Sequence, residues 1–130
     1  MSTFNVGDIS LRCIRLSEEG LLHYFHFEAH NPTKNDLYVS IDRANASYQS
    51  EGRFLIKGGQ TISDLKLPVR LFGDSWQKET MVLSFCISEF IPNPDYDRQM
   101  EEYYADPDVQ EPREMVYSTI TTRSVNFKLR

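Results

Sequence analysis

Hydrophobic and polar residues alternate with a period of two along much of this chain. The clearest run covers residues 21–30, where the odd positions are mostly apolar and most even positions are more polar. A turn-forming stretch at 31–36 follows, and the alternation resumes over residues 37–48. Because successive side chains of a strand point to opposite faces, the pattern predicts two long antiparallel strands at the centre of a β-sandwich.

The same alternation predicts five more strands, at about 9–16, 54–57, 62–72, 79–91 and 115–129. Pro68 lies inside one of them and has no N–H for a sheet ladder, so that strand should lie at a sheet edge or break there. Gly58 and Gly59 separate two extended runs, which indicates a tight hairpin, since the favoured two-residue turns need positive φ.

Two irregularities interrupt the alternation. The apolar positions shift by one residue at Ile14, and they shift again after Asp42. A β-bulge produces such a slip because it inserts one extra residue into a strand. The second slip also fits a strand that crosses from one sheet to the other.

The whole chain, residues 1–130, therefore reads as one all-β domain of about seven strands without a long amphipathic helix. Short strands separated by turn signals resemble an antiparallel two-sheet sandwich of the immunoglobulin-like or fibronectin-like kind. The Cys–Trp–Cys spacing of antibody domains is missing, because the single tryptophan is Trp76. The resemblance therefore concerns the architecture alone.

Charge changes this picture at one place, residues 92–114, which we call the acidic insertion. It contains eight acidic and two basic residues, a net of −6, so the other 107 residues together carry +1 of the total of −5. A connection of this length between two strands is usually functional or disordered. The net negative charge of the chain is thus concentrated in this one segment.

The acidic insertion also contains a predicted short helix, capped by Asn93 or Asp95 and ending near Ala105. We expect it to bind a partner, with aromatic and thioether side chains giving contact area and carboxylates steering towards a basic surface. An alternative is a solvated loop whose tyrosines pack back onto the sandwich. The predicted partner-binding residues are Tyr96, Met100, Tyr103, Tyr104, Asp95, Asp97, Glu101, Glu102, Asp106 and Asp108.

Catalytic and metal-binding patterns are sparse. His26, Glu28 and His30 share one strand face, but residues two apart on a strand are roughly 6.5 Å apart, so all three cannot reach one ion. No nucleophile elbow or phosphate-binding loop is present. We therefore expect no enzyme, metal or cofactor, with a small-ligand or metal-binding enzyme on the His26 face as the alternative.

The overall composition limits location and partners. A pI of about 5.1 disfavours nucleic acid as a partner, and no apolar run reaches the roughly 18 to 20 residues that cross a bilayer. The N-terminus has no signal-peptide pattern, so we expect a cytoplasmic protein with Cys13 and Cys86 as free thiols. An exported, adhesin-like accessory domain with a disulfide is a further alternative.

Together these observations predict a non-catalytic interaction or structural subunit of a larger assembly. It would bind through its acidic insertion and its edge strands, either to a protein with a basic surface or to itself. A self-association hypothesis pairs the insertion with a basic edge formed by Arg12, Arg123, Lys128 and Arg130 of a neighbouring copy.

Overall fold

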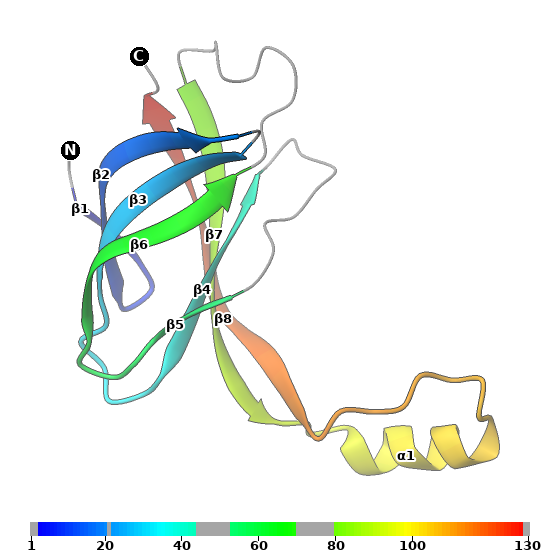
Figure 1. Ribbon diagram of the computed structural model, residues 1–130. Coiled ribbons are helices and arrows are strands. Elements are labelled where there is room, and N and C mark those ends of the chain that lie inside the picture. Colours follow the sequence, from blue (N-terminus) through cyan, green and yellow to red (C-terminus); the bar gives the residue numbers. More distant parts are fainter. Residues whose placement is uncertain (1–2, 21, 44–52, 70–79, 129–130) are drawn as a thin grey trace.

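The computed structural model describes residues 3–20, 22–43, 53–69 and 80–128. This part of the chain forms eight strands and one helix (Figure 1). The elements are β1 (Thr3–Val6), β2 (Ile9–Glu19), β3 (Leu22–His30), β4 (Leu37–Arg43), β5 (Phe54–Ile56), β6 (Thr61–Val69), β7 (Thr80–Pro92), α1 (Tyr96–Ala105) and β8 (Met115–Lys128).

The strands form two antiparallel sheets of four. The first sheet has the order β1-β2-β3-β6 and the second has the order β5-β4-β7-β8. Figure 1 shows the two sheets as layers, with α1 lying beyond one end of them. The protein is therefore mostly β with two packed sheets, as the alternating sequence pattern predicts.

Aromatic rings fill the space between the sheets. Phe27 of the first sheet lies 5.6 Å from Phe85 and 6.0 Å from Phe127 of the second sheet, measured between ring centroids. Phe4 of β1 contacts Phe27 and also Phe85, at 6.3 Å and 5.3 Å. Aromatic pairs at such separations add about 0.5–1.5 kcal/mol each beyond simple area burial. This cluster fastens the two sheets together.

The predicted central pair of strands is only half correct. β3 and β4 are both interior strands, but each belongs to a different sheet, so they do not pair with each other. The chain crosses between the sheets at Asn31, whose side chain is fully buried. Its amide nitrogen donates to the carbonyl oxygens of Asn35 and Ile56, at 2.7 Å and 2.9 Å. This network holds the turn against the end of β5, where a simple hairpin was expected.

The hairpin predicted at Gly58 and Gly59 is wrong. β5 pairs with β4 and β6 pairs with β3, so the two glycines lie in a second crossing between the sheets. Gly59 has a φ of +77°, which favours glycine, and its N–H donates to the carbonyl of Asn31 at 2.8 Å. Both crossings therefore meet at Asn31.

Several other expectations are confirmed. Within the described residues β6 is an edge strand that contains Pro68, and the slip at Ile14 is a β-bulge between Cys13 and Arg15. β1 is an eighth strand that the periodicity did not reveal. The second slip, after Asp42, lies outside the described residues.

β7 and β8 continue past the rest of the second sheet. β4 pairs with β7 only as far as Ser88, while β7 and β8 remain paired out to Pro92 and Met115. The end of β7 and the beginning of β8 therefore form a two-stranded ribbon. This ribbon carries the acidic insertion away from the sandwich (Figure 1).

Candidate functional site

The acidic insertion forms a projecting structure of its own. α1 lies beyond the sandwich (Figure 1), and none of its residues is buried. The predicted helix and its end at Ala105 are confirmed, with Asp95 at the N-cap position but without a side-chain cap hydrogen bond. The alternative in which the tyrosines pack back onto the sandwich does not hold, because α1 is remote from the two sheets.

Asn93 organises the base of the acidic insertion. Its backbone N–H donates to the carbonyl of Glu114 at 2.7 Å, which closes the ribbon. Its side-chain amide donates to Gln99 of α1 at 2.8 Å and to the carbonyl of Arg113 at 2.9 Å. Its side-chain oxygen accepts from the N–H of Asp95 at 3.0 Å. One residue thus joins the start of the helix to the returning chain.

The predicted partner-binding residues divide into two groups. Tyr96, Met100 and Tyr103 lie at helical spacing and are half-buried, whereas Tyr104 is 77% exposed. The acidic residues Asp95, Asp97, Glu101, Glu102, Asp106 and Asp108 are all exposed. The helix therefore presents one partly covered aromatic side and a strongly acidic remainder.

The charges of α1 are only partly balanced. Arg98 lies 3.1 Å from Glu102 and 3.7 Å from Asp95. The last turn of α1 contains no basic residue. Partial burial, helped by the negative charge of Glu114, raises the pKa of the Tyr96 hydroxyl. Tyr96 therefore stays protonated, and most of the carboxylates remain available to an external cation.

A pocket of about 630 Å³ lies between α1, the returning segment and the ribbon. Ile91, Val116 and Pro112 contribute apolar walls, Asp95, Glu102 and Glu111 contribute three carboxylates, and Arg113 contributes one guanidinium. A lysine or arginine side chain combines an apolar stem with a cationic end, so this lining suits such a side chain.

An aromatic patch that the sequence did not single out lies beside the acidic insertion. Phe90 of β7 and Tyr117 of β8 face each other with ring centroids 4.7 Å apart, and Tyr38 lies 5.2 Å from Tyr117. The Arg53 guanidinium stacks over Tyr117 at 4.3 Å. Phe90 and Tyr117 are 43% and 41% exposed. Phe90 has an even residue number, whereas buried Phe85 on the same strand has an odd one. This difference in phase was the sequence signal that could have revealed the aromatic patch.

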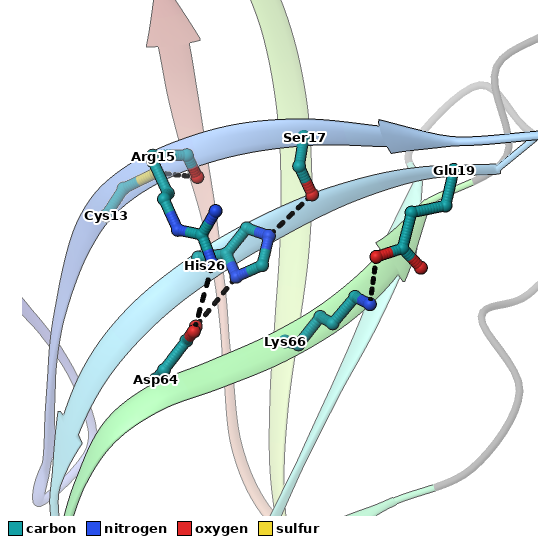
Figure 2. Close-up of polar contacts among 7 residues, drawn as sticks. All are labelled: Cys13, Arg15, Ser17, Glu19, His26, Asp64 and Lys66. Carbon is teal, nitrogen blue, oxygen red and sulfur yellow. Dashed lines mark hydrogen bonds and ion pairs between the residues drawn. The ribbon is translucent and has the colours of Figure 1, made fainter.

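A polar network covers the outer face of the first sheet (Figure 2). His26 of β3 is 2% exposed; its Nε2 lies 2.6 Å from Ser17 Oγ, and its Nδ1 lies 2.7 Å from Asp64 Oδ1. Arg15 donates to the second oxygen of Asp64 at 3.2 Å. These contacts, with His26 the largest cause, lower the pKa of the Asp64 carboxyl. The network ties β2, β3 and β6 together.

Two β-bulges bring these side chains together. The extra residue Ile14 in β2 lets Arg15 pair with His26, and one extra residue in β6 lies between Ile62 and Leu65. Without the first bulge, Arg15 would point to the opposite face, because facing alternates along a strand. Bulges often re-aim side chains near functional sites, which makes this network a second candidate site.

His26, Glu28 and His30, which we expected to lie too far apart to hold one ion, bind three different residues. His26 binds Asp64, Glu28 binds Arg12 at 3.1 Å, and His30 binds Thr61 at 2.8 Å. Among the residues that the structure describes, no three histidine, cysteine or acidic side chains are grouped to hold a metal ion.

The two thiols lie on different faces. Cys13 is buried on the core side of β2, and burial raises the pKa of its thiol. Cys86 is half-buried on the outer face of β7, with its sulfur 3.6 Å from Thr119 Oγ1. Neither thiol is in a disulfide. In the described part of the chain, no helix is long and apolar enough to cross a membrane.

No family model matches this chain, and neither a curated protein nor a solved structure does. The candidate sites therefore rest on their own geometry.

Proposed function

We propose that this protein is a non-catalytic interaction subunit of a larger assembly, and that it binds through the acidic insertion. The observation that carries the proposal is the projection of α1 beyond the sandwich with no buried residue (Figure 1). A helix that adds nothing to the core but is anchored by the Asn93 hydrogen bonds is positioned for contact with another molecule.

The chemistry of the surface supports a protein partner with a basic surface. Exposed Tyr104 and the aromatic patch of Tyr38, Phe90 and Tyr117 supply the residue types enriched at protein interfaces. The carboxylates around the pocket favour a lysine or arginine of the partner. The partner is therefore a protein with a basic surface next to an apolar contact, and nucleic acid is disfavoured by like charge.

The test compares partner capture from the source cells by two forms of the protein. In one form, residues 94–112 are replaced by Asn-Gly; this join is feasible because Asn93 and Glu114 are already hydrogen-bonded. We expect loss of specific partners with the folded sandwich retained by circular dichroism. Recovery of the same partners by both forms would overturn the proposal.

A matched pair of variants separates charge from aromatic contact. Glu101→Gln with Glu111→Gln removes two carboxylates and keeps the side-chain shape, and we expect weaker capture that depends less on salt. Tyr103→Ala with Tyr104→Ala should weaken capture at all salt concentrations. Glu89→Gln, on the ribbon outside the acidic insertion, is the control.

We infer in addition an immunoglobulin-type strand arrangement. The order β2-β3-β6 corresponds to strands A-B-E of such sandwiches, and β5-β4-β7-β8 corresponds to C′-C-F-G. The acidic insertion then occupies the F–G connection, which forms binding loops in variable domains. A cytoplasmic location remains part of this proposal, and fractionation of the source cells tests it.

A second candidate function is hydrolysis at Ser17, on the same His26 face for which the sequence suggested a small-ligand or metal-binding enzyme. It is favoured by one observation, the Ser17–His26–Asp64 chain of hydrogen bonds (Figure 2), which has the order of a nucleophile, a base and an orienting carboxylate. Against it, Ser17 lies inside the β2–β3 ladder, opposite Tyr24. Strand N–H groups committed to the ladder are not free to stabilise an oxyanion. Labelling by a fluorophosphonate that Ser17→Ala abolishes would establish it.

A further inference from the structure

β8 has an unpaired edge along its length in the described part of the chain. It is 14 residues long and pairs with β7 on one side, and the sheet order ends with it. It contains no Pro, Gly, Asp or Glu, and its bulged residue Ile120 is 51% exposed. A long edge strand with these residues is a template for adding another strand.

The faces of β8 are self-complementary about Thr122. Opposite β7, the side chains of Tyr117, Thr119, Thr122, Ser124 and Asn126 point outwards, while those of Ser118, Thr121, Arg123, Val125 and Phe127 point to the core side. The bulge at Ile120 causes the change of phase.

Two copies of β8 can therefore pair antiparallel with Thr122 opposite its own counterpart. Thr121 then faces Arg123, the bulged Ile120 is skipped, and Thr119 faces Ser124. Every opposed pair shares a face, as an antiparallel ladder requires. A surface that is complementary to itself is the condition for a two-fold interface.

Charge complementarity favours a second copy over an unrelated strand. In this register, Met115 lies opposite Lys128 of the second copy. The acidic insertion, which ends at Glu114, then lies next to the basic end of the other β8. Arg123 faces Thr121, so no like charges are opposed. Thr–Ser and Thr–Thr pairs across strands are favourable.

We propose that two copies of this chain associate through antiparallel β8–β8 pairing centred on Thr122, so that each acidic insertion lies against the basic end of the other strand. This inference deepens the proposed function, on which it rests, by naming a second copy as the occupant of the edge strand. It gives the self-association hypothesis of the sequence analysis a closed, two-fold geometry.

Sedimentation equilibrium of the intact protein tests the proposal first. We expect a dimer that weakens with added salt. Thr122→Lys places two ammonium groups opposite each other and should raise the dissociation constant about fivefold or more, since opposed like charges destabilise a pair. Val82→Lys, on the outer face of the interior strand β7, should leave it near the wild-type value. A monomer at all concentrations would overturn the proposal.

Crosslinking tests the register. Cys86→Ser removes the thiol that lies opposite Thr122 within one copy. In that background, Thr122→Cys should form a covalent dimer on mild oxidation. Ser124→Cys, which faces Thr119 of the second copy, should form much less. Equal crosslinking at both positions would overturn the two-fold centre.

Partner capture keeps this result separate from the proposed function. If the protein is monomeric but still loses partners when residues 94–112 are replaced, the dimer inference fails and the proposed function stands. If it dimerises through Thr122 but captures the same partners without the acidic insertion, the proposed function fails, and the dimer remains.

Discussion

His26 Nδ1 and Asp64 Oδ1 are 2.7 Å apart, and they join strands that lie 38 residues apart in the sequence (Figure 2). Ser17 Oγ is hydrogen-bonded to the other ring nitrogen of His26. An almost fully buried imidazole thus has a partner on each side, one hydroxyl and one carboxylate. Buried polar groups destabilise a fold unless they are hydrogen-bonded, so this network is part of what holds the first sheet together.

The lowered pKa of Asp64 makes stability depend on pH. Because the folded-state pKa lies below the unfolded value, Asp64 contributes stability that is fully present above the unfolded pKa, near 3.9. That contribution is lost as pH falls through the folded-state pKa. We expect Asp64→Asn to lower stability at pH 7 and to flatten the acid limb of the profile, measured as urea midpoints from pH 7 downwards.

Ser17→Ala is the matched control for that experiment. It removes the other partner of His26 but no carboxylate. Its stability should fall at every pH while the acid limb keeps the wild-type slope. An Asp64→Asn profile parallel to the wild-type profile would show that this carboxylate does not control the acid response.

Asn31 is the second test of a buried polar group. Its side-chain oxygen accepts from the N–H and the hydroxyl of Thr33, at 3.0 Å and 2.7 Å, in addition to the two bonds its amide donates. Asn31→Ala leaves several buried groups unpaired, and each costs about 1–3 kcal/mol. We expect a loss of about 3 kcal/mol in the free energy of unfolding, measured by urea denaturation.

Asn35→Ala supplies the comparison, because Asn35 takes part through its backbone carbonyl and its side chain is exposed. Its cost should stay within about 0.5 kcal/mol. Similar losses for the two variants would mean that the Asn31 network is not what fastens the crossings.

The strands were predictable because their signal is local. Alternation alone located seven of the eight described strands, and the helix in the acidic insertion was predicted from the capping residue types at Asn93 and Asp95. Strand pairing was not predictable in the same way. Gly58 and Gly59 have the residues of a hairpin, but Asn31 captures the N–H of Gly59 from a distance of 28 positions. Such a long-range contact does not change the alternation of hydrophobic and polar residues, so the sequence pattern does not reveal it.

The candidate sites also differ in whether their signal in the sequence is local or depends on long-range contacts. The ten residues of the acidic insertion were selected because charge composition and tyrosine spacing are visible in the sequence, and their binding role stays a prediction. The His26 network was missed in part, because Asp64 and Ser17 reach His26 only through bulges in β6 and β2. One extra residue in a strand moves every later side chain to the other face, so the sequence suggested Glu28 and His30 as companions for His26.

The two cysteines should react at very different rates. Cys13 is buried, and its raised thiol pKa keeps it protonated at neutral pH, whereas Cys86 is partly exposed. We expect a thiol reagent to modify one cysteine in the folded protein and the second only after unfolding. Cys86→Ser should abolish the fast reaction, and Cys13→Ser should leave it intact. A fast reaction that survives Cys86→Ser would contradict this assignment.

The direction in which the Cys13 thiol changes stability with pH can be tested separately. A thiol with a raised folded-state pKa contributes stability that is fully present below its unfolded pKa, about 8.5. That contribution is lost as pH rises through the folded-state pKa. We therefore expect the urea midpoint of the wild-type protein to fall more steeply above pH 8.5 than that of Cys13→Ala, after subtraction of their difference at pH 7.

Asn93 should control the acidic insertion without controlling the sandwich. Its side chain joins Gln99 to the carbonyl of Arg113, and all of these residues lie outside the two-sheet core. We expect Asn93→Ala to increase amide hydrogen exchange and protease cleavage over residues 96–114, while exchange in β3 and β7 up to Ser88 stays unchanged. Gln99→Ala removes only one of the contacts and should have a smaller effect of the same kind. If Asn93→Ala lowers the global unfolding free energy as much as Asn31→Ala does, the acidic insertion is part of the cooperative fold, and its independence, on which the docking proposal depends, is lost.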